Sequence, residues 1–249
     1  MEELKDVLSK AICGITNPFA GMTESERVSY EQFVLQEEKR KQIEQQKIFE
    51  SKRLEKYQSE ESGVNKKFWN SSIKDYKAET ENEKNILTVV SDFIADVKNK
   101  NCNKFLLMIG TFGTGKTLLG SSIVRECGGF YTTSFKLCVE YESSSDFRAK
   151  KSKLEVYEFY CNIPMLVVDE FGASDKKATE KELIANIIDQ RYENNLPTVL
   201  ISNLSKQQIV EILGRRIFDR LTEICTSVEF TGESKRKNLR SVKHEDSKV

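Results

Sequence analysis

The sequence predicts an α/β fold in which a five-stranded parallel sheet lies between helices and follows a helical N-terminal arm. Apolar runs without alternation are typical of strands buried on both faces of a parallel sheet, and segments with helical spacing separate them. The charged residues 23–60 contain no glycine or proline, so they are expected to form one long helix. Strands are expected at residues 105–109, 130–133, 165–168, 198–201 and 227–230.

The composition argues against several classes of function. Lys and Arg together number 39, as do Asp and Glu, so the net charge is zero and nucleic acid must meet a local patch. No apolar run reaches membrane-spanning length, and the acidic first residues are unlike a signal peptide, so no membrane is expected. The six scattered cysteines form no C-x-x-C pair, which argues against zinc or disulfides and favours the reducing cytoplasm. Because His244 is the one histidine, histidine-based catalysis is not expected.

Residues 1–62 are expected to form the arm. A short amphipathic pattern and a loop with Gly14, Pro18 and Gly21 precede the long helix. The apolar residues of this helix are too sparse to form a core alone, so it is either solvated or docks on a partner. They are Val28, Phe33, Leu35, Ile43, Phe49, Leu54 and Tyr57.

The remaining helices follow from apolar spacing. Residues 63–76 break the long helix and open the second unit. Helical segments are then expected at residues 85–97, within residues 134–162, at residues 178–193 and, as one helix, at residues 207–221. A basic tail, residues 237–249, is expected to be disordered.

A glycine-rich turn joins the first strand of the sheet to the next helix and matches the pattern G-x-x-x-x-G-K-[ST]. Glycines allow several backbone N–H groups to point inward as an anion nest, so we predict a site for a nucleoside triphosphate. Lys116 can reach the β- and γ-phosphates, and the Thr117 hydroxyl can coordinate Mg²⁺. The alternative is a glycine-rich turn with a surface lysine. The predicted binding residues are Gly110, Thr111, Gly113, Thr114, Gly115, Lys116, Thr117 and Leu118.

Two strands end in polar residues that suit the same site. Asp169 and Glu170 follow the strand at 165–168, at the carboxyl edge where open α/β sheets bind ligands. Asp169 can hold Mg²⁺ through water, and Glu170 can polarise the water that attacks the γ-phosphate; the alternative is a helix cap. Asn203 can position that water or sense the γ-phosphate, and it can also cap the helix that starts near Lys206.

With these motifs in view, residues 63–236 resemble the DnaC/IstB family of AAA+ ATPases, which includes replicative-helicase loaders. The resemblance implies a P-loop AAA+ domain of the ASCE class. The matching segments are residues 63–76, 110–117, 166–170, 191–194, 197–204, 213–216, 219–221 and 232–236.

The resemblance also implies roles for single residues. Asp169 and Glu170 match the Walker B pair, and Asn203 matches sensor 1. Arg220 matches the arginine that reaches a neighbouring subunit's nucleotide, and Arg216, on the same helix face, is the less favoured choice. A salt bridge or solvation is the alternative for both arginines. Arg236 lies where a sensor-2 arginine is expected, although Lys235 replaces the aromatic residue usual in the family.

A DNA contact is implied ahead of the Walker B strand. Phe147 and Arg148, followed by Lys150 and Lys151, combine an aromatic ring with cations, as in stacking platforms for single strands. The alternative is a core phenylalanine with solvated lysines. Loaders of the DnaI type often carry a zinc module, but this arm has only Cys13, so no zinc is expected.

The expected function is therefore an ATP-dependent loader with Mg²⁺ as cofactor and slow, DNA-stimulated hydrolysis that releases the loader. Its arm, residues 1–62, would bind a replicative helicase hexamer, and its ATPase units, residues 63–236, would assemble on single-stranded DNA through Arg220 in trans. One alternative is an IstB-type transposition helper that binds duplex DNA. Another is a non-hydrolysing nucleotide-gated DNA-binding scaffold, against which the intact Asp169 and Glu170 argue. A small-molecule kinase is disfavoured because nothing supplies its basic lid.

Overall fold

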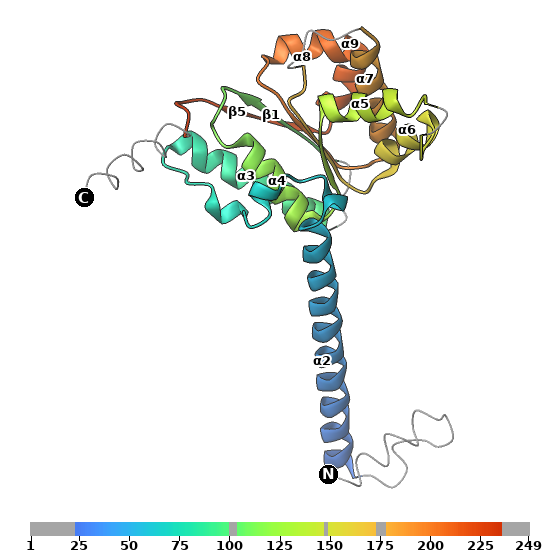
Figure 1. Cartoon of the computed structure of the whole chain (residues 1–249). Coiled ribbons are helices and arrows are strands. Elements are labelled where there is room, and N and C mark those ends of the chain that lie inside the picture. The colour runs from blue at the N-terminus through green and yellow to red at the C-terminus, as the bar shows by residue number, and fades with distance from the viewer. Residues whose placement is uncertain (1–22, 100–103, 147–148, 173–177, 236–249) are drawn as a thin grey trace, which may run out of the picture. The chain divides into compact units, whose positions relative to one another are not determined.

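The computed structural model describes residues 23–99, 104–146, 149–172 and 178–235. The chain divides into two compact units, residues 1–52 and residues 53–249. The elements follow the predicted order, with an N-terminal helix ahead of a five-stranded α/β unit (Figure 1).

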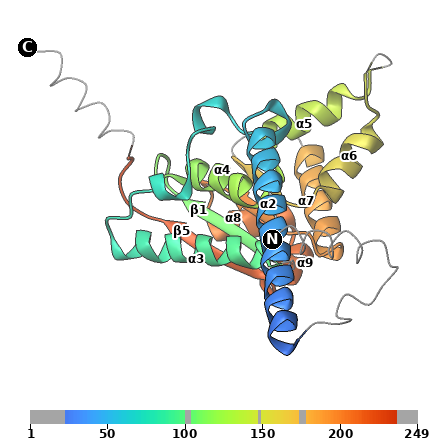
Figure 2. The same cartoon turned by 90° about the horizontal axis from the view of Figure 1, so that it is seen from below.

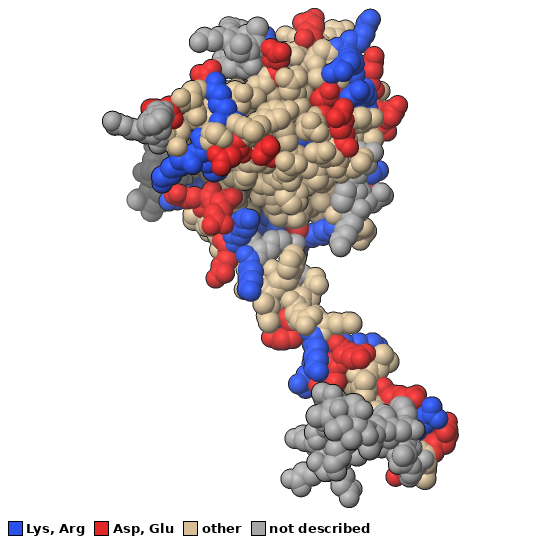
Figure 3. Space-filling model, turned by 90° about the vertical axis from the view of Figure 1, so that its right-hand side faces the viewer, with Lys and Arg blue, Asp and Glu red and all other residues tan. Residues whose placement is uncertain are grey.

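The first unit contains most of the helix α2 (Glu24–Tyr57), which is 34 residues long. The backbone N–H and the hydroxyl of Thr23 donate to the Glu26 carboxylate at 2.8 and 2.7 Å, and these bonds fix the start of the helix. Charged side chains of both signs are interspersed along it (Figure 3). The predicted long helix is thus confirmed, and large apolar side chains on it are exposed, namely Val28, Phe33, Leu35, Ile43, Ile48 and Phe49.

The second unit is built on a parallel sheet with the strand order β2-β3-β4-β1-β5. All residues of β3 and β4 are buried, as predicted for strands covered on both faces. Because β4 lies between β3 and β1, the segments that leave these three strands meet at one edge of the sheet. The strands are β1 (Phe105–Gly110), β2 (Phe130–Thr133), β3 (Leu166–Asp169), β4 (Thr198–Ile201) and β5 (Cys225–Phe230).

Helices cover both faces of this sheet (Figures 1 and 2). Phe105 and Leu107 of β1 belong to a core that includes side chains of α5 to α9, whereas Leu106 and Met108 belong to a second core with α3 and α4. The helices are α3 (Glu81–Lys98), α4 (Lys116–Cys127), α5 (Ser134–Ser143), α6 (Lys153–Asn162), α7 (Ala178–Glu193), α8 (Lys206–Leu213) and α9 (Arg215–Thr222).

One helix prediction is wrong: residues 207–221 form two helices rather than one. Gly214 separates α8 from α9 with φ 81° and ψ 145°, a conformation outside the helical region. Positive φ is available to glycine at little steric cost, so the chain can turn between the two helices at this position. The direction of α9 is therefore not fixed by the axis of α8.

The connection from α2 to α3 consists of three 3-10 turns, η1 (Glu60–Ser62), η2 (Lys66–Phe68) and η3 (Ile73–Asp75). Gly63 ends the first of them with φ 70°, and a Cβ at this position would lie 1.9 Å from the carbonyl oxygen of Tyr131. The long helix ends at Tyr57, ahead of the segment 63–76 that was predicted to break it, and glycine is required at residue 63 because the backbone passes directly over β2.

A buried arginine ties together the opposite edge of the sheet. Arg191 of α7 has 0% exposure, and its guanidinium donates to the carbonyl oxygens of Tyr160, Ile163 and Pro197 and to the Thr198 hydroxyl at 2.8–3.0 Å. Burial lowers the pKa of Arg191 to about 10. The side chain is still charged at neutral pH, and backbone oxygens satisfy most of its donors.

Among the described residues, no helix is both long and apolar enough to cross a membrane.

Candidate nucleotide-binding site

The phosphate loop leaves β1 and enters α4 in the conformation that its glycines predict. Gly110, Gly113 and Gly115 have φ values of 127°, 78° and 100°, all positive. A Cβ at Gly110 would lie 2.1 Å from the carbonyl oxygen of Phe230, and one at Gly115 would lie 2.7 Å from the ring of Tyr76. These glycines therefore serve both the curl of the loop and the close approach of neighbouring segments.

Helix α4 begins at this loop without a capping side chain. Its N-cap residue is Gly115 and makes no side-chain cap, whereas Thr80, Thr133, Ser152 and Ser205 cap α3, α5, α6 and α8. The first N–H groups of α4 thus have no competing cap oxygen. Such a helix start suits a phosphate group.

Lys116 is the first residue of α4 and is almost entirely buried. Its ammonium group donates to the carbonyl oxygens of Gly110 and Thr111 at 2.8 and 2.6 Å. The cation is therefore already held over the loop, where a phosphate oxygen can replace a carbonyl acceptor. Thr114, also buried, closes the turn by donating from its hydroxyl to the Thr111 carbonyl at 2.9 Å.

Asp169 ends β3 and is buried with 5% exposure. Its Oδ2 accepts hydrogen bonds from the Thr117 hydroxyl at 2.9 Å and from the Tyr131 hydroxyl, and its Oδ1 accepts one from the backbone N–H of Glu170 at 2.7 Å. The structure thus joins Thr117 and Asp169, the two predicted metal-holding residues. Burial, followed by the charge of Asp169, raises the pKa of Tyr131 well above its usual value, so the phenol is a donor at neutral pH.

These oxygens fit the cofactor that the sequence predicts. Hydroxyl and carboxylate oxygens are the ligands that Mg²⁺ prefers, usually completed by phosphates and water. Among the described residues, no group of three or more His, Cys, Asp or Glu side chains could hold a metal ion.

Glu170 lies just beyond the strand with an exposed side chain and φ 57°. A left-handed backbone is uncommon for a residue other than glycine and recurs at functional sites. Here the conformation turns the chain so that Asp169 stays buried while the Glu170 carboxylate reaches solvent at the same sheet edge.

Asn203 is half-buried beyond β4, in an open groove that the phosphate-loop residues Gly110, Thr111 and Phe112 also line. The alternative of a helix cap is wrong, since Ser205 caps α8 in a reciprocal capping box with Gln208. The side chain of Asn203 therefore remains on the groove beside the loop.

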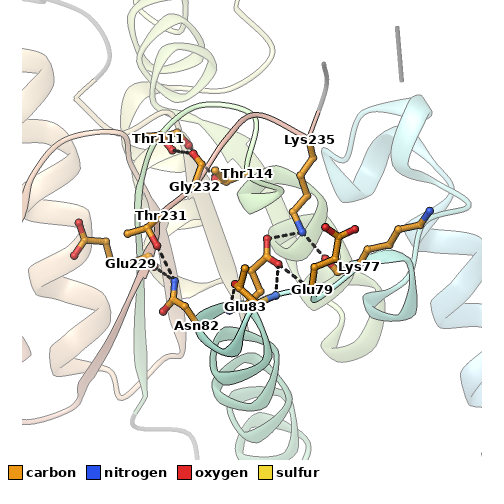
Figure 4. Close-up of polar contacts among 11 residues, drawn as sticks. Lys77, Glu79, Asn82, Glu83, Thr111, Thr114, Glu229, Thr231, Gly232 and Lys235 are labelled. Atoms are coloured by element: carbon orange, nitrogen blue, oxygen red, sulfur yellow. Dashed lines mark hydrogen bonds and ion pairs between the residues drawn. The ribbon is translucent and has the colours of Figure 1, made fainter. Parts of the chain in front are cut away.

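The segment after β5 packs against the phosphate loop (Figure 4). The Thr111 hydroxyl donates to the Gly232 carbonyl at 3.2 Å, and the Lys235 N–H donates to the Gly113 carbonyl at 3.0 Å. The side-chain amide of Asn82 in α3 donates to the Glu229 carbonyl near the end of β5 and to the Thr231 hydroxyl just after it, at 3.0 and 3.1 Å. Arg236, the predicted sensor-2 residue, lies outside the described residues.

Lys235 fastens this segment to the start of α3 (Figure 4). Its ammonium group lies 2.6 Å from the Glu83 carboxylate, donates to the Lys77 carbonyl, and sits 4.4 Å from the ring centroid of Tyr76. The hydrogen bond and charge of Lys235, together with backbone donors from Thr80 and Glu79, lower the pKa of Glu83 to about 2, although burial opposes the shift. The charge of Lys235 thus makes a cation–π contact with the ring of Tyr76.

The two candidate arginines of α9 contact α7 of the same chain. Arg220 donates to Asp189 at 2.9 Å and to Glu193 at 3.2 Å, and Arg216 donates to Asp189 at 3.0 Å. Their side chains are 36% and 73% exposed. The salt-bridge alternative therefore describes both residues in this state, with Arg220 the more tightly held.

The predicted DNA contacts are only partly described. Phe147 and Arg148 lie outside the described residues, whereas Lys150 and Lys151 are exposed. Lys151 lies 3.8 Å from Glu140 and 4.9 Å from the ring centroid of Phe159. Leu118, the last predicted loop residue, is half-buried against the core that contains α3 and α4.

Fold and site together define a P-loop nucleotide-binding domain of the AAA+ type. The family described as "IstB-like ATP binding protein" matches residues 4–243, so the chain belongs to this family, as the sequence motifs predicted. The replicative helicase loader DnaC of Escherichia coli (strain K12) is 26% identical over 164 residues, which is 64% of this chain and 66% of that protein. The replicative helicase loader DnaI of Bacillus subtilis (strain 168) is 24% identical over 165 residues, 59% of this chain and 52% of that protein. These matches span less than two thirds of each curated relative.

The fold comparison agrees. The crystal structure of the DnaC helicase loader superposes with a TM-score of 0.59 at 21% identity, covering 67% of this chain and 100% of that one. At this level of identity the likeness shows the fold alone, and it confirms the predicted α/β domain with its parallel sheet.

Proposed function

We propose that this chain is an ATP-dependent loader of a replicative DNA helicase. Family membership and the similarity to DnaC and DnaI support the proposal. The observation that carries the ATPase part is the convergence of Lys116, Thr117, Asp169 and Glu170 at one edge of the sheet, since these groups can both bind a triphosphate and hydrolyse it.

Nucleotide binding begins with an exchange of acceptors. Lys116 gives up the carbonyl oxygens of Gly110 and Thr111 for β- and γ-phosphate oxygens, and the uncapped N–H groups of α4 bind the phosphates. Thr117 and Asp169 would hold the Mg²⁺ ion, which when bound would neutralise charge on the phosphates.

Hydrolysis depends on the groups that remain solvent-accessible at this edge. The exposed carboxylate of Glu170 accepts a proton from the attacking water, and the side chain of Asn203 orients that water or the γ-phosphate. As a sensor-2 residue, Arg236 contributes a positive charge toward the phosphates. Hydrolysis is slow, is stimulated by DNA and releases the loader.

The partners use surfaces outside this pocket. Residues 1–62 form the arm that binds the helicase hexamer, and the exposed apolar residues of α2, such as Leu35 and Phe49, suit a protein contact. Residues 63–236 form the ATPase, which meets single-stranded DNA through Phe147, Arg148, Lys150 and Lys151. Residues 237–249 form a basic tail.

Self-assembly requires Arg220 to change partners. In the isolated chain its guanidinium is bound to Asp189 and Glu193, and in the assembly it reaches the nucleotide of a neighbouring copy. Because the ion pairs are partly exposed, exchanging them costs little.

The test is ATP hydrolysis by the purified chain alone, with single-stranded DNA and with duplex DNA, at one stated salt concentration. Stimulation by single strands supports the loader and leads to a pull-down with a replicative helicase hexamer. Preference for duplex DNA would instead support a transposition helper. ATP binding with no turnover under any of these three conditions would instead support the non-hydrolysing nucleotide-gated scaffold.

A further inference from the structure

Tyr131 contacts the candidate metal site, although none of the sequence motifs contains this residue. It lies on β2, in register with Val167 of β3, and its side chain extends two residues along the strands to reach Asp169. The residue is buried with 6% exposure. Its hydroxyl donates to Oδ2 of Asp169, the same oxygen that the Thr117 hydroxyl uses.

Two glycines allow neighbouring segments to approach this tyrosine closely. Gly63 leaves no room for a side chain above the Tyr131 carbonyl. On the other side, a Cβ at Gly120 of α4 would lie 3.4 Å from Cε2 of Tyr131 and 2.6 Å from Cδ1 of Ile201, so helix and strand pack at close range. The burial of the ring and its hydrogen bond to Asp169 hold the hydroxyl at the end of β3.

The Tyr131 hydroxyl occupies one of the acceptor positions of the Asp169 carboxylate. A carboxylate offers about four lone-pair positions, two on each oxygen. Thr117 and Tyr131 occupy those of Oδ2, and the Glu170 N–H occupies one on Oδ1. No other donor to Oδ1 is found among the described residues, so one position on it is open, and the three donors restrain the direction in which it points.

We propose that Tyr131 is a positioning residue, which orients Asp169 toward Mg²⁺ and so sets the Mg²⁺ concentration at which the site binds ATP. The inference rests on the proposed function, because it assumes that Mg²⁺ and ATP bind together at Thr117 and Asp169. Groups that orient a metal-holding carboxylate typically change metal affinity by about 10- to 100-fold when removed.

The experiment is a Mg²⁺ titration of the binding of a fluorescent, non-hydrolysable ATP analogue to the full chain. For Tyr131→Phe, the half-saturating Mg²⁺ concentration should rise by about tenfold, while binding of the analogue in EDTA stays unchanged. Tyr131→Met, which also lacks the hydroxyl, should show the same shift. Circular dichroism and the unfolding midpoint without nucleotide verify that each variant is folded.

Tyr160→Phe is the matched control. Tyr160 is also buried and also donates its hydroxyl to a carboxylate, Glu140, at 2.7 Å, but neither residue touches the phosphate loop. A shift in both Tyr131 variants without a shift in the control supports the proposal. Equal Mg²⁺ dependence of the Tyr131 variants and the wild type would overturn it, as would an equal shift in Tyr160→Phe. A wild-type chain that binds the analogue without any effect of Mg²⁺ would overturn the proposed Mg²⁺ site and this inference with it.

Discussion

Asp169 and Arg220 are both held by groups from distant segments, but they are held in opposite ways. Asp169 is buried, and the three hydrogen bonds it accepts come from neutral donors, namely two hydroxyls and a backbone N–H. Arg220 is partly exposed, and carboxylates of α7 pair with its charge. A buried anion that only neutral donors contact can gain stability by binding a cation. An exposed ion pair, in contrast, can exchange partners at low cost in free energy. The first arrangement is suited to ligand binding at a fixed geometry, and the second to a contact that changes.

The largest expected effect concerns Glu170, the residue that follows the fixed Asp169. Glu170→Gln should lower ATP turnover by about 10²- to 10⁴-fold, the usual contribution of a general base, with ATP binding retained. Turnover measured under single-strand stimulation, with binding measured in parallel, checks the prediction. Glu158→Gln, an exposed carboxylate on α6, is the control and should behave like the wild type. Normal turnover of Glu170→Gln would remove this residue from the mechanism.

Lys116→Ala should weaken ATP binding by roughly 100-fold, because it removes charge-assisted hydrogen bonds to phosphate that contribute about 1.5–3 kcal/mol each. Equilibrium binding of a fluorescent ATP analogue measures the loss. Lys104→Ala removes a surface lysine whose ammonium lies 3.5 Å from Asp96, and it should leave binding unchanged. Similar losses in both variants would mean that general charge, rather than the loop, binds the nucleotide.

Arg220→Ala tests the exchangeable side. ATP binding should be unaffected, and the DNA-stimulated part of turnover should fall roughly tenfold, within the usual range of coupling between sites. Arg216→Ala is the matched variant on the same helix, since it also loses an ion pair with Asp189 but should keep the stimulation. If Arg220→Ala hydrolysed ATP normally with DNA present, the pair with Asp189 and Glu193 would be structural only.

The smallest expected effect concerns Lys235 and Glu83, an ion pair whose side chains are 31% and 12% exposed and which therefore lies between the two cases. The pKa of Glu83 falls from 4.5 to about 2 in the folded chain, so the pair stabilises fully above pH 4.5 and loses this contribution as the pH falls toward 2. Glu83→Gln should therefore reduce the dependence of the unfolding midpoint on pH in that window. Glu81→Gln, an exposed carboxylate in the same first turn, should change it less. Identical pH profiles for wild type and Glu83→Gln would contradict the prediction.

Much of the fold could be predicted from local patterns. The strand at residues 130–133, the strand at residues 198–201 and the helix at residues 178–193 have the bounds that apolar spacing indicated. The start of α8 could also be predicted from the sequence, since Ser205 and Gln208 have the spacing of a capping box. The break at Gly214 was not, because a glycine within a helical pattern is often tolerated.

The candidate site likewise has a part that could be predicted from the sequence and a part that could not. The phosphate loop is contiguous in sequence, and Asp169 follows an apolar run, so both could be found from the chain alone. The contact of Tyr131 with Asp169 depends on the pairing of β2 with β3, and that of Arg220 with Asp189 depends on how α9 packs on α7. Such partnerships arise from tertiary packing, which a single sequence does not encode locally.

Arg191 has a consequence for the protein in the cell. One guanidinium serves three backbone carbonyls and a hydroxyl at the edge of the sheet opposite the phosphate loop, so a substitution there leaves several buried acceptors without donors at once. The molecules that still fold would keep an intact site, but fewer of them would escape proteolysis. Damage at this residue would therefore appear as low abundance, with normal specific activity in the molecules that survive.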